Sequence, residues 1–265
     1  MLHLTPAVTI YILTLSALFG LVSGSFANCC AWRMAHGESA AKGRSHCVAC
    51  GHTLSPRELI PVISWVVQKG RCRHCGAPVS IRYPLTEGFT AIAFVLIVLR
   101  YDVTLNTLQF WILTAVLLTI ALVDLETGYI PDSLVLGIAL DFTVVTALRG
   151  GPFWSLWLKG VFNAAAVALP LLGLVLLMDR VLGRESMGGG DIKLFFAIGL
   201  FSHWSCNLFT LLLSCFLGIA FALIFRGVCT EDGEGAFPFG PAIAAAAFLS
   251  ILAAEPAVQA YLSLF

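Results

Sequence analysis

The chain has 265 residues, of which 59% are hydrophobic and only 11% charged, and its formal net charge is zero. Soluble globular domains carry about 25% charged residues, so this composition excludes an ordinary soluble protein and predicts an all-α membrane protein that crosses the bilayer several times. The basic residues are few and more than half of them lie in one segment, so we expect the lipid bilayer, and not nucleic acid, as the chain's surroundings.

Eight apolar runs are candidate transmembrane helices. They cover about residues 8–26, 85–100, 107–123, 133–148, 158–178, 192–204, 208–225 and 237–254. A helix perpendicular to the bilayer needs about 20 apolar residues, and by this measure the fourth and sixth runs are the weakest. No Lys or Arg precedes the first run, which favours a retained helix, with cleavage near Ser23-Gly24-Ser25 as the alternative.

A long polar segment, residues 28–83, separates the first two runs. It contains eight of the fifteen Lys and Arg residues, so the positive-inside rule places it in the cytoplasm and both termini outside. The predicted organisation is a first transmembrane helix at 1–27, a small cytoplasmic domain at 28–83 and a membrane domain at 84–265.

Two stretches of the polar segment repeat one pattern. Cys47–Ser55 and Cys72–Ser80 both read C-x-x-C-G-x-x-[LV]-S. Two such knuckles supply four thiolates, which suits a tetrahedral structural zinc ion. The glycine after each pair allows a positive φ in the turn around the metal. The sequence therefore predicts a zinc-ribbon-like domain. Its expected ligands are Cys47, Cys50, Cys72 and Cys75.

Disulfides or free thiols are the alternatives to a metal in this segment. Disulfides are disfavoured on the reducing side of a membrane, and a segment with few large apolar side chains gains folding free energy from a bound metal. Three neighbouring histidines are substitute ligands or surface residues: His46, His52 and His74. The other five cysteines fit small apolar positions, with lipidation as the alternative for Cys29-Cys30.

Two aspartates stand at the edges of candidate spans. Asp124 ends the third span, and Asp191 opens the sixth directly after three glycines, Gly188–Gly190. Two crossings separate them, so both are expected on one side of the membrane, the cytoplasmic side. Asp191 could also be a helix N-cap. Asp124 has no such explanation, because a carboxylate at a helix C-terminus faces the negative end of the helix dipole.

Two aspartates brought together at a membrane edge can act as an acid–base pair. Like charges a few ångströms apart do not both ionise, so the pair shares a proton. The ionised member takes a proton from water, and the protonated member hydrogen-bonds a scissile carbonyl. Asp124 and Asp191 are thus candidate catalytic residues.

Other polar positions leave more than one interpretation open. Asp132 is expected to cap the fourth span. Asp141, deep in that span, is either protonated and hydrogen-bonded or functional. Lys193 either extends to the interface or helps to hold the ionised pair. The acidic, Gly-rich run 227–236 predicts a solvated turn, and the tail after Glu255 predicts a short interfacial helix.

With these residues in place, the chain resembles the type IV prepilin peptidases, which are bilobal membrane aspartyl proteases. The motif Gly188–Asp191 is similar to the GxGD signature shared with presenilin-like intramembrane proteases. The ordered set of motifs comprises Ser25–Asn28, the two knuckles, Ile60–Trp65, Gly70–Gly76, Tyr83–Glu87, Asp124–Glu126, Ile130–Asp132 and Gly188–Asp191.

The resemblance implies that Asp124 and Asp191 are the catalytic pair. It implies substrates that are prepilins or type II secretion pseudopilins, cut between a basic leader and an apolar helix at the bacterial inner membrane. It also implies N-methylation of the new terminus from S-adenosylmethionine by the cytoplasmic segment. Glu58-Leu59 stands where the family often has an acid–Asn pair, and no glycine fingerprint of an ordinary methyltransferase is present.

Two other classes of function fit parts of the sequence. A transporter would use Asp124, Asp141 and Asp191 as a cation path, although the broken repeats of many transporters are not apparent. A structural assembly factor would hold pilin precursors through the small domain without cutting them.

Overall fold

The computed structural model describes residues 5–39, 43–225 and 238–263. Throughout these residues the regular structure is helical, with only two isolated β-bridges besides. Six of the helices are long and apolar enough to cross a membrane. The prediction of an all-α membrane protein is confirmed. The turn predicted at 227–236 lies outside the described residues.

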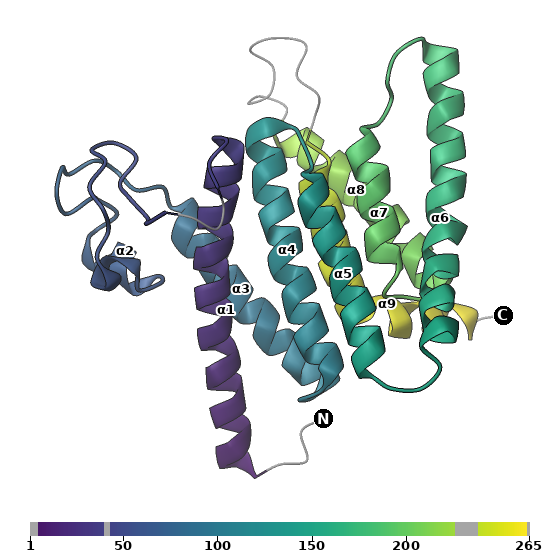
Figure 1. The fold of residues 1–265 in the computed structure, drawn as a ribbon, viewed down its shortest axis with the longest axis horizontal. Coiled ribbons are helices and arrows are strands. Elements are labelled where there is room, and N and C mark those ends of the chain that lie inside the picture. Colours follow the sequence, from purple (N-terminus) through teal and green to yellow (C-terminus); the bar gives the residue numbers. More distant parts are fainter. Residues whose placement is uncertain (1–4, 40–42, 226–237, 264–265) are drawn as a thin grey trace. The chain divides into compact units, whose positions relative to one another are not determined.

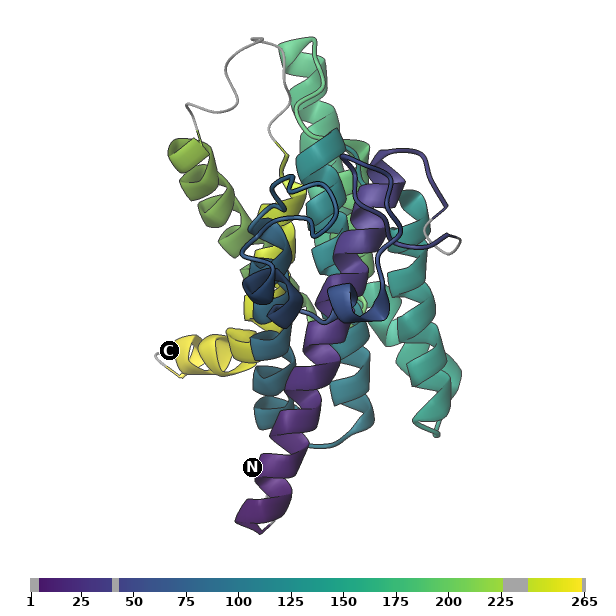
Figure 2. The same cartoon turned by 90° about the vertical axis from the view of Figure 1, so that its left-hand side faces the viewer.

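The chain divides after Thr107 into two compact units. In the first, α1 (Pro6–Ala35) packs against α3 (Arg82–Tyr101) (Figures 1 and 2). A Cβ at Gly24 would lie 2.7 Å from Thr90 Oγ1 and 2.8 Å from Glu87 Cα. Small residues on α1 thus allow this close approach, as they commonly do between membrane helices.

The small domain lies between these two helices in the sequence. Its regular elements are a 3₁₀ turn, η1 (Pro56–Leu59), and one short helix, α2 (Ile63–Val67). The remaining described residues of the domain form turns and the two isolated bridges. Domains of this size with so little regular structure commonly have a bound metal or disulfides that fix their shape.

The second unit contains the remaining helices. They are α4 (Leu105–Thr127, entering from the first unit), α5 (Asp132–Leu148), α6 (Phe153–Leu182), α7 (Gly189–Gly199), α8 (Trp204–Phe225) and α9 (Gly240–Leu262). They follow the predicted order, and the two weakest candidates, α5 and α7, have only 17 and 11 residues. At 1.5 Å per residue, α7 is roughly 17 Å long, too short to cross a bilayer.

The short helix α7 is enclosed by protein. It packs against α5, α6, α8 and α9, and Leu194, Phe195 and Ile198 are buried there. The Asn207 side chain on α8 donates hydrogen bonds to the Asn163 carbonyl at 3.2 Å and to the Gly199 carbonyl at 2.9 Å. Packing with its neighbours therefore fixes the position of α7.

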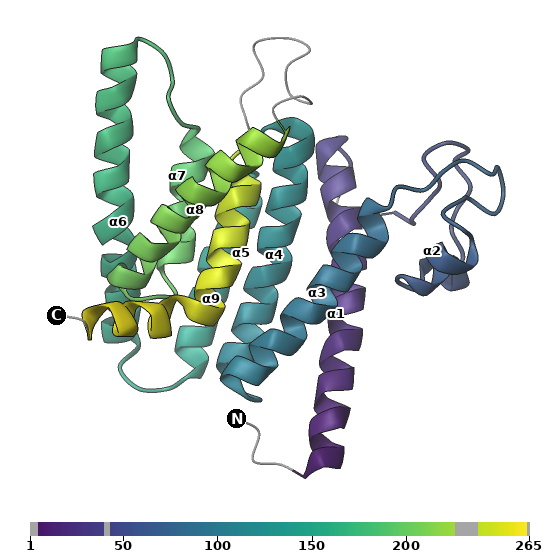
Figure 3. The same ribbon diagram turned by 180° about the vertical axis from the view of Figure 1, so that it is seen from behind.

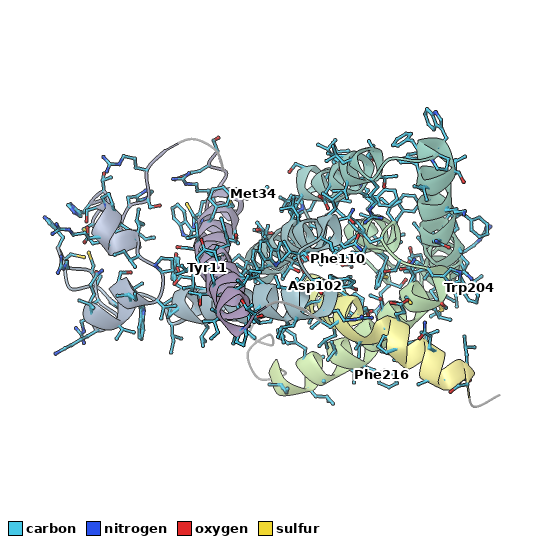
Figure 4. The ribbon with its side chains drawn as sticks, turned by 90° about the horizontal axis from the view of Figure 1, so that it is seen from below. Tyr11, Met34, Asp102, Phe110, Trp204 and Phe216 are labelled. Carbon is cyan, nitrogen blue, oxygen red and sulfur yellow. The ribbon has the colours of Figure 1, made fainter. Side chains whose placement is uncertain are left out.

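The outer surface of the second unit is apolar. Phe216 on α8 is 71% exposed and lies at the edge of the unit, whereas Phe110 on α4 lies among the helices and is buried (Figure 4). Helix α9 contains Pro256, and its last turns bend away from its long first part (Figures 2 and 3). Proline inside a helix produces such a kink, so the helix expected after Glu255 is the bent end of α9.

Candidate active site and metal centre

Asp124 lies three residues before the end of α4 and is 5% exposed. Its Oδ2 accepts a hydrogen bond of 2.8 Å from the N–H of Gly240, the first residue of α9. The first N–H groups of a helix have no partner within it and carry its positive partial charge. The N-terminus of α9 therefore compensates for the unfavourable position of Asp124 at the C-terminal end of its own helix.

The absence of a side chain at Gly240 leaves room for this contact. A Cβ there would lie 2.7 Å from Asp124 Oδ2 and 3.0 Å from its Cγ, so any larger residue would displace the carboxylate or the start of α9. Sequence reasoning missed this residue. Gly240 stands between Phe239 and Pro241, and proline in the first turn marks a helix start. That signal predicts the end of a helix, but not the distant carboxylate that its N–H meets.

Asp191 is the third residue of α7 and is half-buried. Gly188 is the N-cap, no side chain caps this helix end, and the Asp191 N–H donates to the Gly188 carbonyl at 3.1 Å. The capping interpretation of Asp191 is therefore wrong. Its carboxyl group lies in the first helical turn, where the dipole favours negative charge.

The two carboxyl groups are close enough for the charge of Asp124 to act on Asp191. One close backbone contact helps to hold their helix ends together. A Cβ at Gly190 would come 3.1 Å from the Cβ of Ile130, which lies in the turn after α4. A Cβ at Gly189 would meet nothing within 4 Å. One of the three glycines thus has a packing role between these ends, and none has a positive φ.

Lys193 and Asp132 form an ion pair near this site. Lys193 Nζ donates to Asp132 Oδ1 at 2.8 Å, and both side chains are exposed. Asp132 is the first residue of α5, whose N-cap is Pro131, so the prediction that Asp132 caps this helix is wrong. Lys193 therefore has a carboxylate partner outside the pair of Asp124 and Asp191.

Asp141 lies on α5 and is 9% exposed. Its Oδ2 is buried and has no hydrogen-bond partner among the described residues. At this oxygen atom, Asp141 lacks the hydrogen bond that the first of its two interpretations expects.

The four predicted metal ligands come together in the small domain. The Sγ atoms of Cys47, Cys50, Cys72 and Cys75 all lie within 4.8 Å of one another, and those of Cys47 and Cys75 are 3.9 Å apart. Zn–S bonds of 2.3 Å in a tetrahedron place the sulfur atoms roughly 3.8 Å apart. All four cysteines are free of disulfide bonds, so this donor set fits a zinc ion.

The sequence repeat is also a structural repeat. The N–H of the first cysteine of each knuckle donates to a carbonyl five residues ahead, Cys47 to His52 at 2.9 Å and Cys72 to Ala77 at 2.8 Å. The glycines after the second cysteines, Gly51 and Gly76, have φ values of 69° and 74°, as predicted.

Each knuckle also has one antiparallel bridge at the same place, His46 with Thr53 and Arg71 with Pro78. The rings of His52 and His74 stack at 4.7 Å. The two halves of the cysteine cluster are therefore equivalent turns facing each other.

Comparison with known proteins finds a matching family model in each of the two units. A family model described as the bacterial peptidase A24 N-terminal domain matches residues 18–101, which include the four cysteines. The model of the type IV leader peptidase family matches residues 111–223, which include Asp124 and Asp191. No solved structure matches the chain.

Curated relatives match over most of their length. The prepilin leader peptidase/N-methyltransferase of Aeromonas hydrophila is 34% identical over 222 residues, which cover 84% of this chain and 76% of the relative. The proteins of the same name from Pseudomonas putida and Bacillus subtilis are 30% and 31% identical, covering 91% and 95% of this chain and 91% and 98% of the relatives. The chain therefore belongs to the type IV leader peptidase family.

Proposed function

We propose that this chain removes the leader from type IV prepilins or type II secretion pseudopilins and then methylates the new N-terminal amine. The relatives are named prepilin leader peptidase/N-methyltransferase. The observation that carries the proposal for the cleavage step is that Asp191, in the first turn of α7, lies within reach of the charge of Asp124, near the end of α4. Paired carboxyl groups that interact in this way are the machinery of aspartic proteases.

The surroundings of the pair assign a role to each member. A main-chain N–H donates to Asp124 at 2.8 Å, and such a bond stabilises the ionised form of a carboxyl group. Asp124 therefore takes a proton from the attacking water. Asp191 keeps the shared proton and donates it in a hydrogen bond to the scissile carbonyl, which stabilises the negative charge that develops on that oxygen.

The substrate class follows from the position of this pair in a membrane protein. The apolar helix of a prepilin would lie in the bilayer and its basic leader in the cytoplasm, with the scissile bond at the membrane edge. The basic residues of segment 28–83 favour a cytoplasmic location for the small domain. We therefore place the enzyme in the bacterial inner membrane, with Asp124 and Asp191 on the cytoplasmic side.

The four cysteines would hold a structural zinc ion. A closed set of four thiolates leaves no open coordination position, so this metal would stabilise the small domain and would not activate water. The methyl group for the second activity would come from S-adenosylmethionine, the donor that the resemblance implies.

Two matched substitutions test the role of the carboxyl pair. Asp124→Asn and Asp191→Asn should each lower the rate of leader cleavage by about 10²–10⁴-fold, the usual contribution of a general acid or base. The assay uses purified protein in detergent and a prepilin substrate. Asp132→Asn removes an exposed carboxylate near the same helix ends and should keep most of the activity. Wild-type cleavage by either of the first two variants would refute the assignment.

A further inference from the structure

The short helix α2 of the small domain turns its apolar side chains outward. Ile63, Val66 and Val67 lie three and four positions apart, so they share one face of the helix, and they are 60–65% exposed. Ile60, just before the helix, is exposed as well. These four residues are called the α2 apolar face below. A water-soluble domain rarely exposes such a group of neighbouring aliphatic side chains unless they bind a partner.

The opposite side of α2 faces the interior of the first unit. Trp65 is partly buried, and its Nε1–H donates to the Val79 carbonyl at 3.0 Å. Ser64, Trp65 and Gln68 line a cavity of about 560 Å³ that the small domain shares with the end of α1 and the start of α3. Helix α2 is therefore inverted relative to a helix of a soluble domain, with its serine and glutamine inside and its aliphatic residues outside.

The start of α2 is fixed to the membrane helix α3. Val62 has φ 59° and ψ −52°, and the Ile63 N–H donates to the Pro61 carbonyl at 2.5 Å, which forms a γ-turn with positive φ. The buried carboxylate of Glu87 on α3 accepts the Val62 N–H at 2.7 Å. A strained turn persists only where its surroundings hold it, so the α2 apolar face keeps a defined direction relative to α3.

The small domain lies beside the membrane helices of its unit. In Figures 1 and 3, α2 is near the height of the first turns of α3 and below the C-terminal end of α1. With 20 residues, α3 is roughly 30 Å long, about the thickness of the hydrocarbon core of a bilayer. Its first turns therefore lie at one boundary of that core, and Leu85 there is 62% exposed, as expected next to lipid. Helix α2 reaches the same boundary.

Basic residues border the α2 apolar face. Arg57 precedes it by three residues and Lys69 follows it by two, and both are exposed. Glu58 is the only acid between residues 56 and 69, and its carboxylate accepts two hydrogen bonds from Ser55. The anionic headgroups of the cytoplasmic leaflet attract Lys and Arg. An apolar face bordered by basic residues is the pattern of helices that lie in the interface of a membrane.

We propose that the α2 apolar face docks into the cytoplasmic leaflet of the bilayer, with its aliphatic side chains among the acyl chains and with Arg57 and Lys69 at the lipid phosphates. The proposed orientation of the protein serves only to name the leaflet. Helices α1 and α3 tether the domain at both of its ends, so a weak affinity for lipid is sufficient. Docking would hold the cavity on the other side of α2 at the membrane surface, where a membrane-embedded helix can reach it.

Photo-crosslinking from position 66 tests the docking. The full-length protein with Val66 replaced by p-benzoylphenylalanine is reconstituted into vesicles of phosphatidylethanolamine and phosphatidylglycerol and irradiated. Mass spectrometry should find lipid adducts on the peptide that contains position 66. The same probe at Ile92, an exposed position in the middle of α3, is the positive control. At Val48, a similarly exposed valine of the first knuckle, the yield should be several-fold lower.

Four results would overturn the docking. Crosslinks from position 66 to residues 108–265 would show that the second unit covers this face, and crosslinks to another copy of the chain would show a dimer interface. Crosslinks to added prepilin in place of lipid would make the substrate the occupant. A lipid yield at position 66 no higher than at Val48 would leave the face in water. Thermal unfolding reports whether each protein that carries the probe is folded.

The bordering charges provide a second measurement. Arg57→Gln combined with Lys69→Gln removes both positive charges and keeps the aliphatic side chains. The lipid yield at position 66 should fall several-fold in vesicles that contain phosphatidylglycerol and stay unchanged in vesicles of phosphatidylcholine alone. Arg44→Gln combined with Arg180→Gln, a matched pair of exposed basic residues away from this face, should leave the yield unchanged. An equal fall in both pairs, or no fall in the first, would overturn the role of Arg57 and Lys69.

Discussion

The two units build their functional sites in opposite ways. In the first unit, the cysteine cluster is assembled from two copies of one short turn, and Cys47 and Cys75 are only 28 positions apart. In the second unit, Asp124 meets Gly240 across 116 positions, and the charge of Asp124 reaches Asp191 at the start of another helix. The first site is built from local turns that bring four free thiols together, whereas the second depends on how long helices pack. The two sites should therefore fail under different perturbations.

Loss of the proposed zinc ion should have the largest effect on stability, and only in the first unit. Cys47→Ser combined with Cys72→Ser removes one ligand from each knuckle. Structural zinc contributes on the order of 10 kcal/mol to folding in small zinc domains. Metal analysis should find no zinc, and limited proteolysis should cut within residues 43–81.

The helices of the second unit should keep their protease resistance in this variant. Cys215→Ser, which changes an exposed cysteine of α8, is the matched control and should retain the metal. A folded, protease-resistant small domain without metal would show that its turns do not need a cross-link.

Gly240→Ala should lower the rate of leader cleavage by the second unit, although it adds and removes no polar group. The added Cβ would lie 2.7 Å from Asp124 Oδ2, so the carboxylate or the start of α9 must move. A misplacement of about 1 Å in a catalytic group can lower the rate about 10²-fold, and we expect a loss of this order in kcat for leader cleavage. Gly173→Ala, a helical glycine with nothing within 4 Å of an added Cβ, should cleave normally. Equal activity in the two variants would contradict a positioning role for Gly240.

Alanine substitutions of the glycines before Asp191 should lower the rate of leader cleavage by different amounts. Gly190→Ala brings a Cβ to 3.1 Å from Ile130, so the turn after α4 must shift slightly, and we expect roughly a tenfold fall in cleavage rate. Gly189→Ala meets open space and should stay within about twofold of wild type. The comparison is made at equal amounts of folded protein. A larger loss in Gly189→Ala would instead point to contact between that residue and the substrate.

Loss of the ion pair between Lys193 and Asp132 should have the smallest effect on stability and on cleavage. Both side chains are exposed, and exposed pairs typically contribute about 0–1 kcal/mol. Lys193→Met should therefore lower the free energy of unfolding by less than about 1 kcal/mol and change cleavage by less than about threefold. Thermal unfolding in detergent and the peptide assay measure these effects. A loss of activity as large as that of Asp124→Asn would mean that Lys193 serves the carboxyl pair directly.

The difference between the units also explains what could be predicted from the sequence. The cysteine cluster was predicted completely, because its ligands, its repeat and the positive φ of Gly51 and Gly76 are all encoded within a few residues. The helix order was predicted from apolar runs. The enclosure of α7 was not, because a buried helix and a lipid-facing helix are equally apolar in sequence.

The neighbours of Asp124 could not be predicted for a similar reason. Counting crossings indicates that two acids share one side of the membrane, but it cannot say which third segment meets them. The contact with Gly240 is a main-chain hydrogen bond between helices far apart in the sequence. Helix packing determines such a contact, and the residue types in the sequence do not predict it.

That hydrogen bond has a practical consequence for mutational studies. Because the donor is a backbone amide, no exchange of one polar side chain for another can delete it. An alanine scan of polar residues would pass over the start of α9. Replacing the amide of Gly240 with an ester would remove the donor while adding no side-chain atom. Such a backbone substitution would measure how much this N–H stabilises the Asp124 carboxylate.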